Sequence, residues 1–482
     1  MSADKADACG RPRVVQCSCG VPSGEAPSGA TMAPNGVSTV GHAGSHVWGD
    51  CVRHQRLRVT MQRSLNQESH GLRRVECQTA GVDTADKLRQ LGAAADLDVA
   101  APGSGSGTSR RPKTAPAPGV CHVAGKGGST LLRVLMTDRC EHDCHFCPLR
   151  AAAPRRRTGF EPQELARLFR DMHDRGIVDG LFLSSAVDGT PDATMERMLA
   201  AVEIMRTWGE FDGYIHLKLL PGASDTAVEL AARLASRVSI NVEAPNGAYL
   251  ERLGTGKDMA RDILRPMRLL HRMEQEGNLP SGISTQYVVG AAGESDREIV
   301  SSVRWLSEEL GLRRAYFGLY RPTPGDGLVD RPAAHPNRQA RLYQADWLTR
   351  MYGLPHDDVA DAFDPRGNLP LGVDPKVSIA LARPERFPLD VNHASREELL
   401  RVPGIGPVSA DRIVTLRRSH KFTDLTQLKR AGVAVGRAAP FVLIDGRQPI
   451  EARVQHARLT RQHAATPAQF GVQLGLPGLE QV

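Results

Sequence analysis

The chain has 482 residues, 41% of them hydrophobic, which is enough for two or three domains with ordinary cores. No apolar run approaches the ~18–20 residues that span a bilayer, and the N-terminus lacks the apolar core of a signal peptide, so we expect a cytoplasmic protein. In that compartment the nine cysteines stay reduced and favour metal or redox chemistry over disulfides. A net charge of +7 suits a polyanionic partner without requiring one.

The N-terminal part of the chain offers little pattern. Residues 1–82 show no sustained periodicity and are predicted to be a disordered tail, or sequence upstream of a later start codon. Residues 83–120 combine one short predicted helix, DTADKLRQLGAAADL, with a linker rich in Gly, Pro and Ser.

Residues 121–330 alternate short β-rich runs with segments of helical spacing, which is typical of a parallel βα barrel. The six runs are LLRVLMT, GLFLSSA, YIHLKLLP, VSINVEA, STQYVVGA and AYFGLYRP. Helices are predicted at EPQELARLFRDMHDRG, SDTAVELAARLA and SDREIVSSVRWLSEEL, the last with a capping box from Ser295 to Glu298. The predicted fold class is therefore α/β, with a partial, TIM-like (β/α)6 barrel.

Several of these runs place polar residues on one face. His216 and Lys218 alternate with apolar neighbours, as do Asn241 and Glu243. A polar lumen in a partly open barrel favours a bound ligand. The alternative is a set of buried polar pairs that satisfy one another.

Three cysteines, Cys140, Cys144 and Cys147, stand close together in TDRCEHDCHFCPLR, directly after the first run. Thiolates at this density favour an iron–sulfur cluster or a zinc site, and three ligands leave one coordination position open for chemistry. A structural zinc knuckle is the alternative. It needs a fourth ligand, for which His142 and His145 are the nearest candidates.

The Cys-x3-Cys-x2-Cys spacing after a first barrel strand, with Phe146 before the last cysteine, resembles the radical S-adenosylmethionine superfamily. The resemblance implies that the three cysteines hold a 4Fe-4S cluster, whose fourth iron chelates the amino and carboxylate groups of S-adenosylmethionine. It also implies one-electron cleavage of that cofactor to a 5′-deoxyadenosyl radical, fed by an electron donor such as flavodoxin or ferredoxin.

Later strands extend the resemblance. LFLSSAV occupies the place of the superfamily's Gly-Gly-Glu strand, although its acidic residue is absent here; SINVEA suits the methionine or ribose, and VVGAAGE resembles the strand beside adenine. The implied cofactor-binding residues are Phe146, Ser184, Ser185, Asn241, Glu243, Val288, Gly290 and Glu294. From strand alternation, the candidate catalytic residues near the substrate are His216, Lys218, Tyr316 and Tyr320.

Arginines at 155–157, in the PRRR segment that follows the cluster loop, permit two readings. One hypothesis is that they bind phosphates near the mouth of the barrel, and the other is that they form a solvated run of charge.

After a predicted helical connector at 331–386, residues 387–445 resemble a helix-hairpin-helix module. Ser395 and Glu398 form a capping box, and Pro407 suits a first helical turn after PGIG. A Gly-x-Gly turn that feeds a helix N-terminus aims backbone N–H groups at an anion such as a DNA phosphate. The predicted DNA-binding residues are Gly404, Gly406, Arg412, Arg417, Arg418 and Lys421.

The alternative for this module is a helical bundle that supports the barrel or an oligomer, because modest charge alone does not establish DNA contact. FTDLTQLKRAGVAVGRAAPF reads as a second, degenerate hairpin. Residues 446–482 are predicted to be a flexible tail, in which AQFGVQLGLPGL faintly resembles a sliding-clamp-binding segment.

Together the segments GVCHVAGKGG, DGLFLSSAV, TMERM, GYIHLKLLPGAS, RLYQADWL, DPKVSIAL and RVPGIG resemble the DNA modification or repair radical S-adenosylmethionine proteins. That family is linked with a uracil-DNA-glycosylase-like partner. We therefore expect a radical enzyme that acts on DNA. A tRNA-modifying radical enzyme and a non-catalytic iron–sulfur DNA-binding scaffold for the glycosylase-like partner remain the alternatives.

Overall fold

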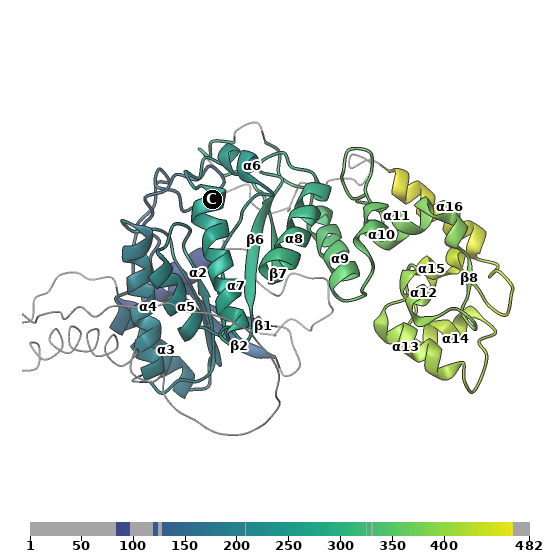
Figure 1. The fold of residues 1–482 in the computed structure, drawn as a ribbon, viewed down its shortest axis with the longest axis horizontal. Coiled ribbons are helices and arrows are strands. Elements are labelled where there is room, and N and C mark those ends of the chain that lie inside the picture. The colour runs from purple at the N-terminus through teal and green to yellow at the C-terminus, as the bar shows by residue number, and fades with distance from the viewer. Residues whose placement is uncertain are drawn as a thin grey trace, which may run out of the picture. The chain divides into compact units, whose positions relative to one another are not determined.

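A curled sheet of seven strands, in the order β1 to β7, forms the centre of the first half of the structure (Figure 1). The computed structural model describes residues 83–96, 119–123, 128–207, 209–323, 325–328 and 331–465. The predicted N-terminal tail, most of the linker and the clamp-like segment lie outside these ranges. The strands are β1 (Val120–Val123), β2 (Ser129–Leu135), β3 (Gly180–Ser184), β4 (Tyr214–Lys218), β5 (Arg237–Ser239), β6 (Ile283–Val289) and β7 (Leu312–Leu319).

Strands β2 to β7 pair in parallel, in chain order, which confirms the predicted partial (β/α)6 barrel. Strand β1 is an addition: it pairs antiparallel with β2 and extends the sheet at its edge. Its four residues are too few to show a strand period in the sequence.

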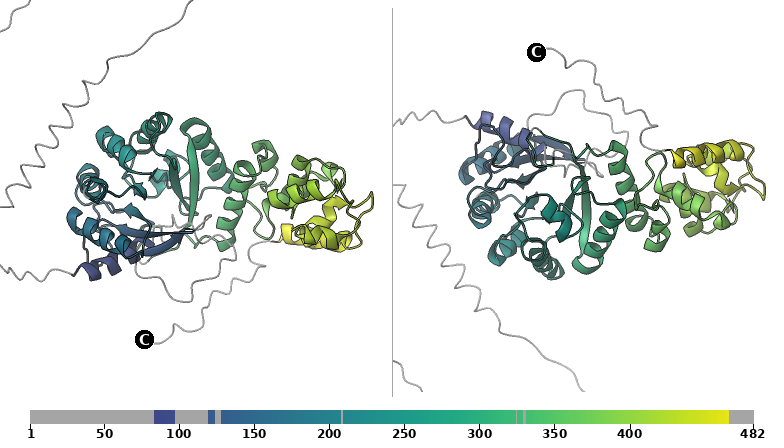
Figure 2. Two further views of the ribbon diagram at one scale, coloured as in Figure 1. Left: turned by 90° about the horizontal axis from the view of Figure 1, so that it is seen from below. Right: turned by 90° about the horizontal axis from the view of Figure 1, so that it is seen from above.

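Helices cover the outer face of the curled sheet (Figure 2). They are α2 (Thr84–Asp96), α3 (Pro162–Asp174), α4 (Pro191–Thr207), α5 (Asp225–Leu234), α6 (Gly247–Arg252), α7 (Arg265–Gln275) and α8 (Asp296–Leu310), with a π-helical turn, η1 (Met259–Leu264), before α7. Leu132, Leu181, Ile215 and Val238 from successive strands are fully buried against these helices. The core therefore lies between the sheet and the helices.

The predicted start signals operate where they were expected. Ser295 and Glu298 form the capping box of α8, which ends at Gly311 with a φ of +63°. Helix α3 starts with a second capping box, from Glu161 to Glu164, which the sequence pattern did not single out.

The C-terminal half is helical and has its own hydrophobic core, which includes Val377, Leu399, Ile413 and Leu428. Its helices are α9 (Pro336–Arg350), α10 (His356–Ala360), α11 (Pro375–Ala382), α12 (Arg396–Arg401), α13 (Pro407–Leu416), α14 (Leu425–Arg430), α15 (Val435–Ala438) and α16 (Ala452–Ala464). Short 3-10 turns lie at η2 (Pro384–Arg386) and η3 (Ala439–Phe441), and β8 (Leu389–Asp390) pairs in parallel with β9 (Val442–Leu443).

Helix α16 corrects the prediction of a flexible tail from residue 446. Leu459 and Ala452 are buried, and Leu459 belongs to the C-terminal core. The helix presents few apolar side chains and is otherwise polar, so its sequence lacks the wide apolar stripe that predicts a packed helix.

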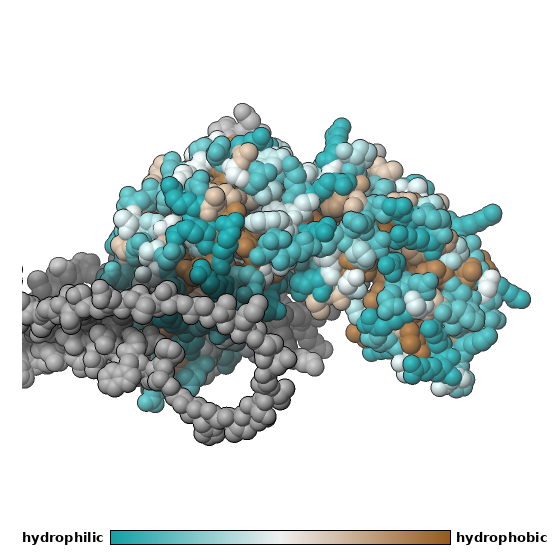
Figure 3. Space-filling model, in the orientation of Figure 1, coloured by the Kyte–Doolittle hydropathy of each residue, from teal (hydrophilic) through white to brown (hydrophobic). Residues whose placement is uncertain are grey.

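Within the described ranges, no helix combines the length and the apolar character that a membrane crossing needs. Figure 3 shows a face that is mainly hydrophilic, with hydrophobic groups in small scattered spots. Two exposed apolar residues, Val408 and Leu416, belong to α13.

Candidate functional site

The three predicted cluster ligands lie in one loop that follows β2 at the carboxyl edge of the parallel sheet. Cys144 is buried, and Cys140 and Cys147 are partly exposed. The backbone N–H of Cys147 donates to the carbonyl of Cys144 at 3.0 Å, and the Sγ of Cys147 accepts from the N–H of Leu149 at 3.4 Å. The carboxyl edge is where α/β barrels build their active sites.

A single guanidinium, that of Arg157, holds this loop together. It donates to the backbone carbonyls of Asp138, Leu149, Arg150 and Ala153, with 2.7 Å to Leu149 O. Arg157 thus stabilises the thiol loop through its backbone. Neither hypothesis for the PRRR segment, phosphate binding or a solvated run of charge, included this structural role.

The loop also docks on glycines from two other segments. The ring of His145 lies where a Cβ on Gly254 or Gly327 would have to be, and the N–H of His145 donates to Leu253 O at 3.0 Å. Gly254 has a φ of +60°, so both its conformation and its lack of a side chain are needed there.

A largely buried cation, Lys257, lies beside the thiols. Its Nζ is 3.6 Å from Oε1 of Glu243, and that same oxygen accepts a hydrogen bond from Nδ2 of Asn241 at 3.2 Å. Glu243 is 5% exposed and has a φ of +62°, which is rare for a residue with a side chain and is found mainly at functional sites.

The electrostatics join these groups into one cluster. Burial raises the pKa of the Cys144 thiol, against the influence of Lys257, and raises the pKa of Cys147 to about 12. Burial opposes the charge on Lys257, but Glu243 and the three cysteines together raise its pKa above the ordinary value. Lys257 therefore stays charged beside the carboxylate of Glu243 and the cysteine thiols.

Unpartnered buried atoms mark the space around this cluster. Within the described residues, Oε2 of Glu243, Oγ of Ser185 and Nδ1 of His145 are buried without a hydrogen-bond partner. Buried polar atoms are normally paired, so these three are available to a ligand.

A 4Fe-4S cluster with S-adenosylmethionine fits this donor set. Three thiols on one loop supply the sulfur ligands, and the orphaned oxygens of Glu243 and Ser185 suit a polar cofactor. In the described part of the chain, no group of three or more Cys, His, Asp or Glu side chains is arranged so that it could hold a metal ion in this structure.

The other predicted cofactor residues occupy several positions around the site. Ser184 ends β3 and is buried, Val288 is 9% exposed in β6, and Phe146 packs against the main core.

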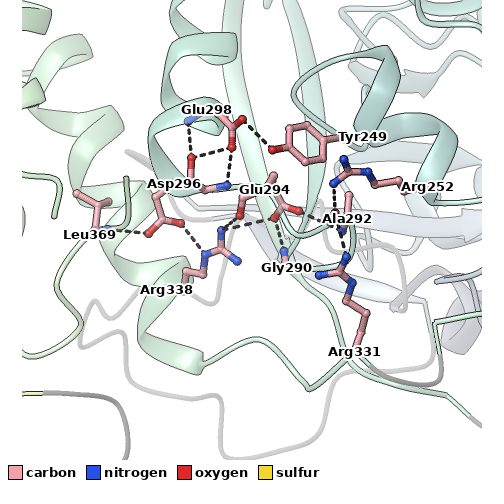
Figure 4. A network of polar contacts seen from close by, with 11 residues as sticks. Tyr249, Arg252, Gly290, Ala292, Glu294, Asp296, Glu298, Arg331, Arg338 and Leu369 are labelled. Atoms are coloured by element: carbon pink, nitrogen blue, oxygen red, sulfur yellow. Dashed lines mark hydrogen bonds and ion pairs between the residues drawn. The ribbon is translucent and has the colours of Figure 1, made fainter. Parts of the chain in front are cut away.

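Gly290 and Glu294 build a turn after β6 (Figure 4). Glu294 accepts hydrogen bonds from the N–H groups of Gly290 and Ala292, and Arg338 of α9 lies 3.6 Å from its Oε1. Arg338 also pairs with Asp296 at 2.6 Å. Both carboxylate oxygens of Glu294 are thus engaged with the protein.

The four candidate catalytic residues divide between two environments. His216 and Lys218 lie on β4, and Tyr316 packs with Phe182 in a small cluster separate from the main core. Tyr320 belongs to the main core, and its Oη donates to Asp326 at 3.0 Å.

The predicted hairpin turn joins α12 to α13. Gly404 has a φ of +83°, and its carbonyl accepts from the N–H of Ala434, in the second hairpin, at 2.9 Å. Gly406 is the N-cap of α13 and provides no side-chain capping hydrogen bond, and Pro407 occupies the first helical turn as predicted. The Oη of Tyr352 lies 3.3 Å from the place that a Cβ on Gly406 would take. No side-chain cap of Gly406 therefore engages the backbone N–H groups of the first turn of α13.

The predicted cations of this module differ in their availability. Arg417 turns inward and donates to Val391 O at 2.9 Å and to Ala394 O at 2.6 Å. Arg412, Arg418 and Lys421 are exposed.

Two family models match the chain. The radical SAM superfamily model matches residues 134–306, which include the thiol loop and strands β3 to β6. Residues 134–306 are a radical S-adenosylmethionine domain. The helix-hairpin-helix motif matches residues 387–432, so this motif is also present.

No curated protein matches the chain. Among solved structures, it is similar to HydG, a maturase of the [FeFe]-hydrogenase, with 10% identity over 45% of this chain and 48% of that one and a TM-score of 0.36. It is also similar to methylornithine synthase, PylB, with 14% identity over 55% of this chain and 66% of that one and a TM-score of 0.34. It is similar, too, to the methyltransferase TsrM from Kitasatospora setae, with 15% identity over 40% of this chain and 36% of that one and a TM-score of 0.32. The chain thus spans about half the length of the first of these structures.

Lys257 is the residue of the radical S-adenosylmethionine domain that the sequence analysis missed. It follows Gly254-Thr255-Gly256, where a Gly-rich turn before a helix was the available signal. Its N–H donates to Oγ1 of Thr255 at 3.2 Å, and Asp258 then caps η1, so the local sequence fixes its position. A π-helical turn often accompanies a functional site.

Proposed function

We propose that this chain is a radical S-adenosylmethionine enzyme that acts on nucleic acid, with DNA modification or repair as the preferred role. The observation that carries the proposal is the pairing of a thiol loop beside Lys257 and Glu243 with a helix-hairpin-helix turn in one chain. The first supports radical chemistry, and the second supports contact with a phosphate backbone.

In this proposal Cys140, Cys144 and Cys147 hold the cluster. The bound cluster and S-adenosylmethionine would supply the 5′-deoxyadenosyl radical. Glu243 and Ser185 orient the cofactor with their unpartnered oxygens, and Lys257 balances the negative charge of the buried site.

The helix-hairpin-helix module holds the nucleic acid by its backbone. The amides at the start of α13 face one phosphate, and Arg412, Arg418 and Lys421 add charge nearby. Arg417 supports the module from within, through its bonds to Val391 and Ala394. Such contacts read no base, so access to a base needs extrusion from the duplex or a single-stranded substrate.

Substrate deuteration tests the proposal. The reconstituted protein is reduced and incubated with S-adenosylmethionine and one deuterated nucleic acid: duplex DNA, single-stranded DNA or tRNA. The 5′-deoxyadenosine that forms is then examined for deuterium. We expect transfer from DNA, because the radical takes its hydrogen from the substrate. Transfer from tRNA alone would favour the tRNA-modifying alternative, and absence of S-adenosylmethionine cleavage would favour the scaffold.

Binding provides a matched control. Arg418→Gln with Lys421→Gln should weaken DNA binding and lower the salt-dependence slope by about 2, since each phosphate contact contributes roughly 0.9. Arg304→Gln removes an exposed arginine of α8 and should leave binding unchanged. Equal binding by both variants and the wild type would contradict the assignment of the interface.

Two partners complete the proposal. The family resemblance supports a uracil-DNA-glycosylase-like protein, and the reduction step calls for a flavodoxin or ferredoxin.

A further inference from the structure

The inner face of the curled sheet carries a row of polar and aromatic side chains. Phe182 of β3 is in register with His216 of β4, and Gln286 of β6 is in register with Tyr316 of β7. The apolar residues next to these four in the sequence belong to the core under the helices, so the four face inward. Phe182 and Tyr316 form a small separate cluster with Leu131, so the curl of the sheet brings β3 and β7 together on this side.

This inner row borders on accessible space. Phe182, His216, Gln286 and Tyr316 are 3%, 5%, 6% and 8% exposed. The two sequence neighbours of each, which lie on the other face of the sheet, are at most 1% exposed. Because the outer face is sealed, the accessible surface of the strands at this level lies on the inner side.

The side chain of Gln286 has no partner in the described protein. Its Oε1 is buried without a hydrogen bond, and no described residue bonds to its Nε2. Oγ of Ser284, on the same face of β6, is also buried and unpartnered. On the opposite face, Oγ1 of Thr285 donates to Ile240 O at 2.7 Å and accepts from the N–H of Val242 at 3.1 Å. Buried polar groups are normally paired, so the inner side of β6 offers an amide and a hydroxyl to a ligand.

The cations of the same face are engaged with the protein. Arg237 forms a hydrogen bond with Tyr214, and Arg133 and Lys218 each have a partner as well. The group that the inner face leaves wholly available is therefore the uncharged carboxamide of Gln286, which carries both donors and an acceptor.

His216 adds a neutral aromatic surface to this face. Burial and two neighbouring cations lower its pKa well below the ordinary value, so the ring is uncharged. Its Nε2 lies 2.9 Å from Oγ of Ser239, and its ring stacks on Phe182 with 4.2 Å between the ring centres. The hydrogen bond and the stacking together fix the plane of the imidazole.

We propose that the inner face of the sheet is a nucleobase site, in which the amide of Gln286 hydrogen-bonds to the edge of the base. The choice of a nucleobase rests on the proposed function. The edge of a base presents donors and acceptors in one plane, which a carboxamide matches with its own. The flat faces of a base suit the aromatic side chains Phe182, His216 and Tyr316. A base that reaches this site has left the duplex or comes from a single strand.

Oligonucleotides with and without bases test the inference. The full chain is titrated with single-stranded oligonucleotides of equal length and charge that carry only A, C, G or T, or only abasic sites. The anisotropy of a terminal dye reports binding. We expect at least one base to give about tenfold or more tighter binding than the abasic strand, which keeps only the backbone contacts. Equal affinity for all five strands would overturn the inference.

Matched glutamine substitutions locate the preference. Gln286→Met removes the amide, keeps the length of the side chain, and should lower the preference over the abasic strand about tenfold. Gln275→Met, on the exposed surface of α7, should leave the preference unchanged. A preference that survives Gln286→Met in full would contradict the proposed contact.

Unfolding without nucleic acid shows whether the amide is unpartnered. Gln286→Met should unfold at or above the wild-type midpoint, because the buried amide that it removes has no bond in the protein. Thr285→Val should unfold at a lower temperature, because it breaks the bonds to Ile240 and Val242. A loss in Gln286→Met as large as that in Thr285→Val would show that the protein itself binds the amide, which would overturn the inference.

The same series in RNA separates the base site from the choice of DNA. A preference that is confined to RNA strands and lowered by Gln286→Met would support the base site and reject DNA as the polymer. These measurements need no cluster, cofactor or reductant, so they decide the base site independently of S-adenosylmethionine cleavage.

Discussion

At the scale of single residues, Lys257 is the side chain on which the candidate site depends most. It is mostly buried, and Glu243 and the three cysteines keep it charged. It also follows Gly254, against which the ring of His145 packs. Lys257 thereby links Glu243 to the loop that carries the three cysteines.

Removal of the charge of Lys257 should destabilise the protein even before any cofactor binds. Lys257→Met leaves Glu243 buried and unpaired, so we expect the free energy of unfolding of the apo-protein to fall by ~3–5 kcal/mol. Chemical denaturation measures the change. The double variant with Glu243→Gln should recover most of the loss, whereas Arg304→Gln should change stability by less than ~1 kcal/mol. A Lys257→Met protein as stable as the wild type would contradict the pairing.

Arg157 supports the same loop by geometry rather than by charge. Arg157→Lys keeps the charge but loses the planar fork that reaches several carbonyls at once, so we expect a loss of ~1–3 kcal/mol and less iron and sulfide per chain after reconstitution. Iron analysis and unfolding curves check both effects. Full iron loading with wild-type stability would show that the clamp is dispensable.

The grouping of Cys140, Cys144 and Cys147 in one loop was predictable from the sequence because they stand within eight residues of one another. The role of Lys257 was not predictable, because it depends on an ion pair with Glu243 of a preceding segment, and no spacing rule in the sequence indicates that pairing. The same limit applies to Arg157, whose partners are backbone carbonyls that carry no sequence signal.

At the scale of elements, the hairpin turn between α12 and α13 is the most constrained part of the nucleic-acid module. Gly404→Ala would place a Cβ 2.6 Å from the carbonyl oxygen of Ala434 at a φ of +83°. The left-handed conformation alone costs ~1–2 kcal/mol with a side chain, and the overlap adds to it. We expect lower stability and loss of DNA binding.

A glycine in the second hairpin provides the control for that substitution. A Cβ on Gly436 meets nothing within 4 Å, so Gly436→Ala should retain both stability and binding. Equal effects of the two substitutions in unfolding and binding measurements would contradict the role of the first turn.

Lys376 of α11 supports the same turn through hydrogen bonds to its backbone. Its Nζ donates to the carbonyls of Leu400 at 2.7 Å and Ile405 at 2.5 Å, and it lies 4.9 Å from the ring centre of Tyr352. Burial lowers the pKa of Lys376 to about 7.

This shift sets a direction for the dependence of stability on pH. An unfolded lysine has a pKa near ~10.4, so between about 7 and ~10 the unfolded chain binds more protons than the folded one. The contribution of Lys376 to stability should therefore rise with pH across that window. Unfolding curves of wild type and Lys376→Met measure it, and a stability difference between them that is flat or falls with pH would contradict the shift.

The elements themselves were largely predictable, since the six parallel strands and the start of α8 follow period and capping rules. Strand β1 and helix α16 were not. The first is too short to show a period, and the second is held by a few apolar contacts from other segments rather than by a wide stripe of its own.

At the scale of the whole molecule, the chain combines a radical S-adenosylmethionine domain at 134–306 with a helix-hairpin-helix motif at 387–432. In the account proposed above, the second holds a polymer by its backbone while the first reacts with one of its nucleotides. The net charge of +7 suits a polyanionic substrate without requiring one.

The most direct test of this account is the formation of 5′-deoxyadenosine. The full chain is reconstituted with iron and sulfide without oxygen, reduced, and supplied with S-adenosylmethionine, with and without DNA; the control replaces Cys140, Cys144 and Cys147 by Ala. The account predicts product from the wild type, increased by DNA, and none from the control. No product from a cluster-loaded wild type under either condition, or equal product from the control, would contradict it.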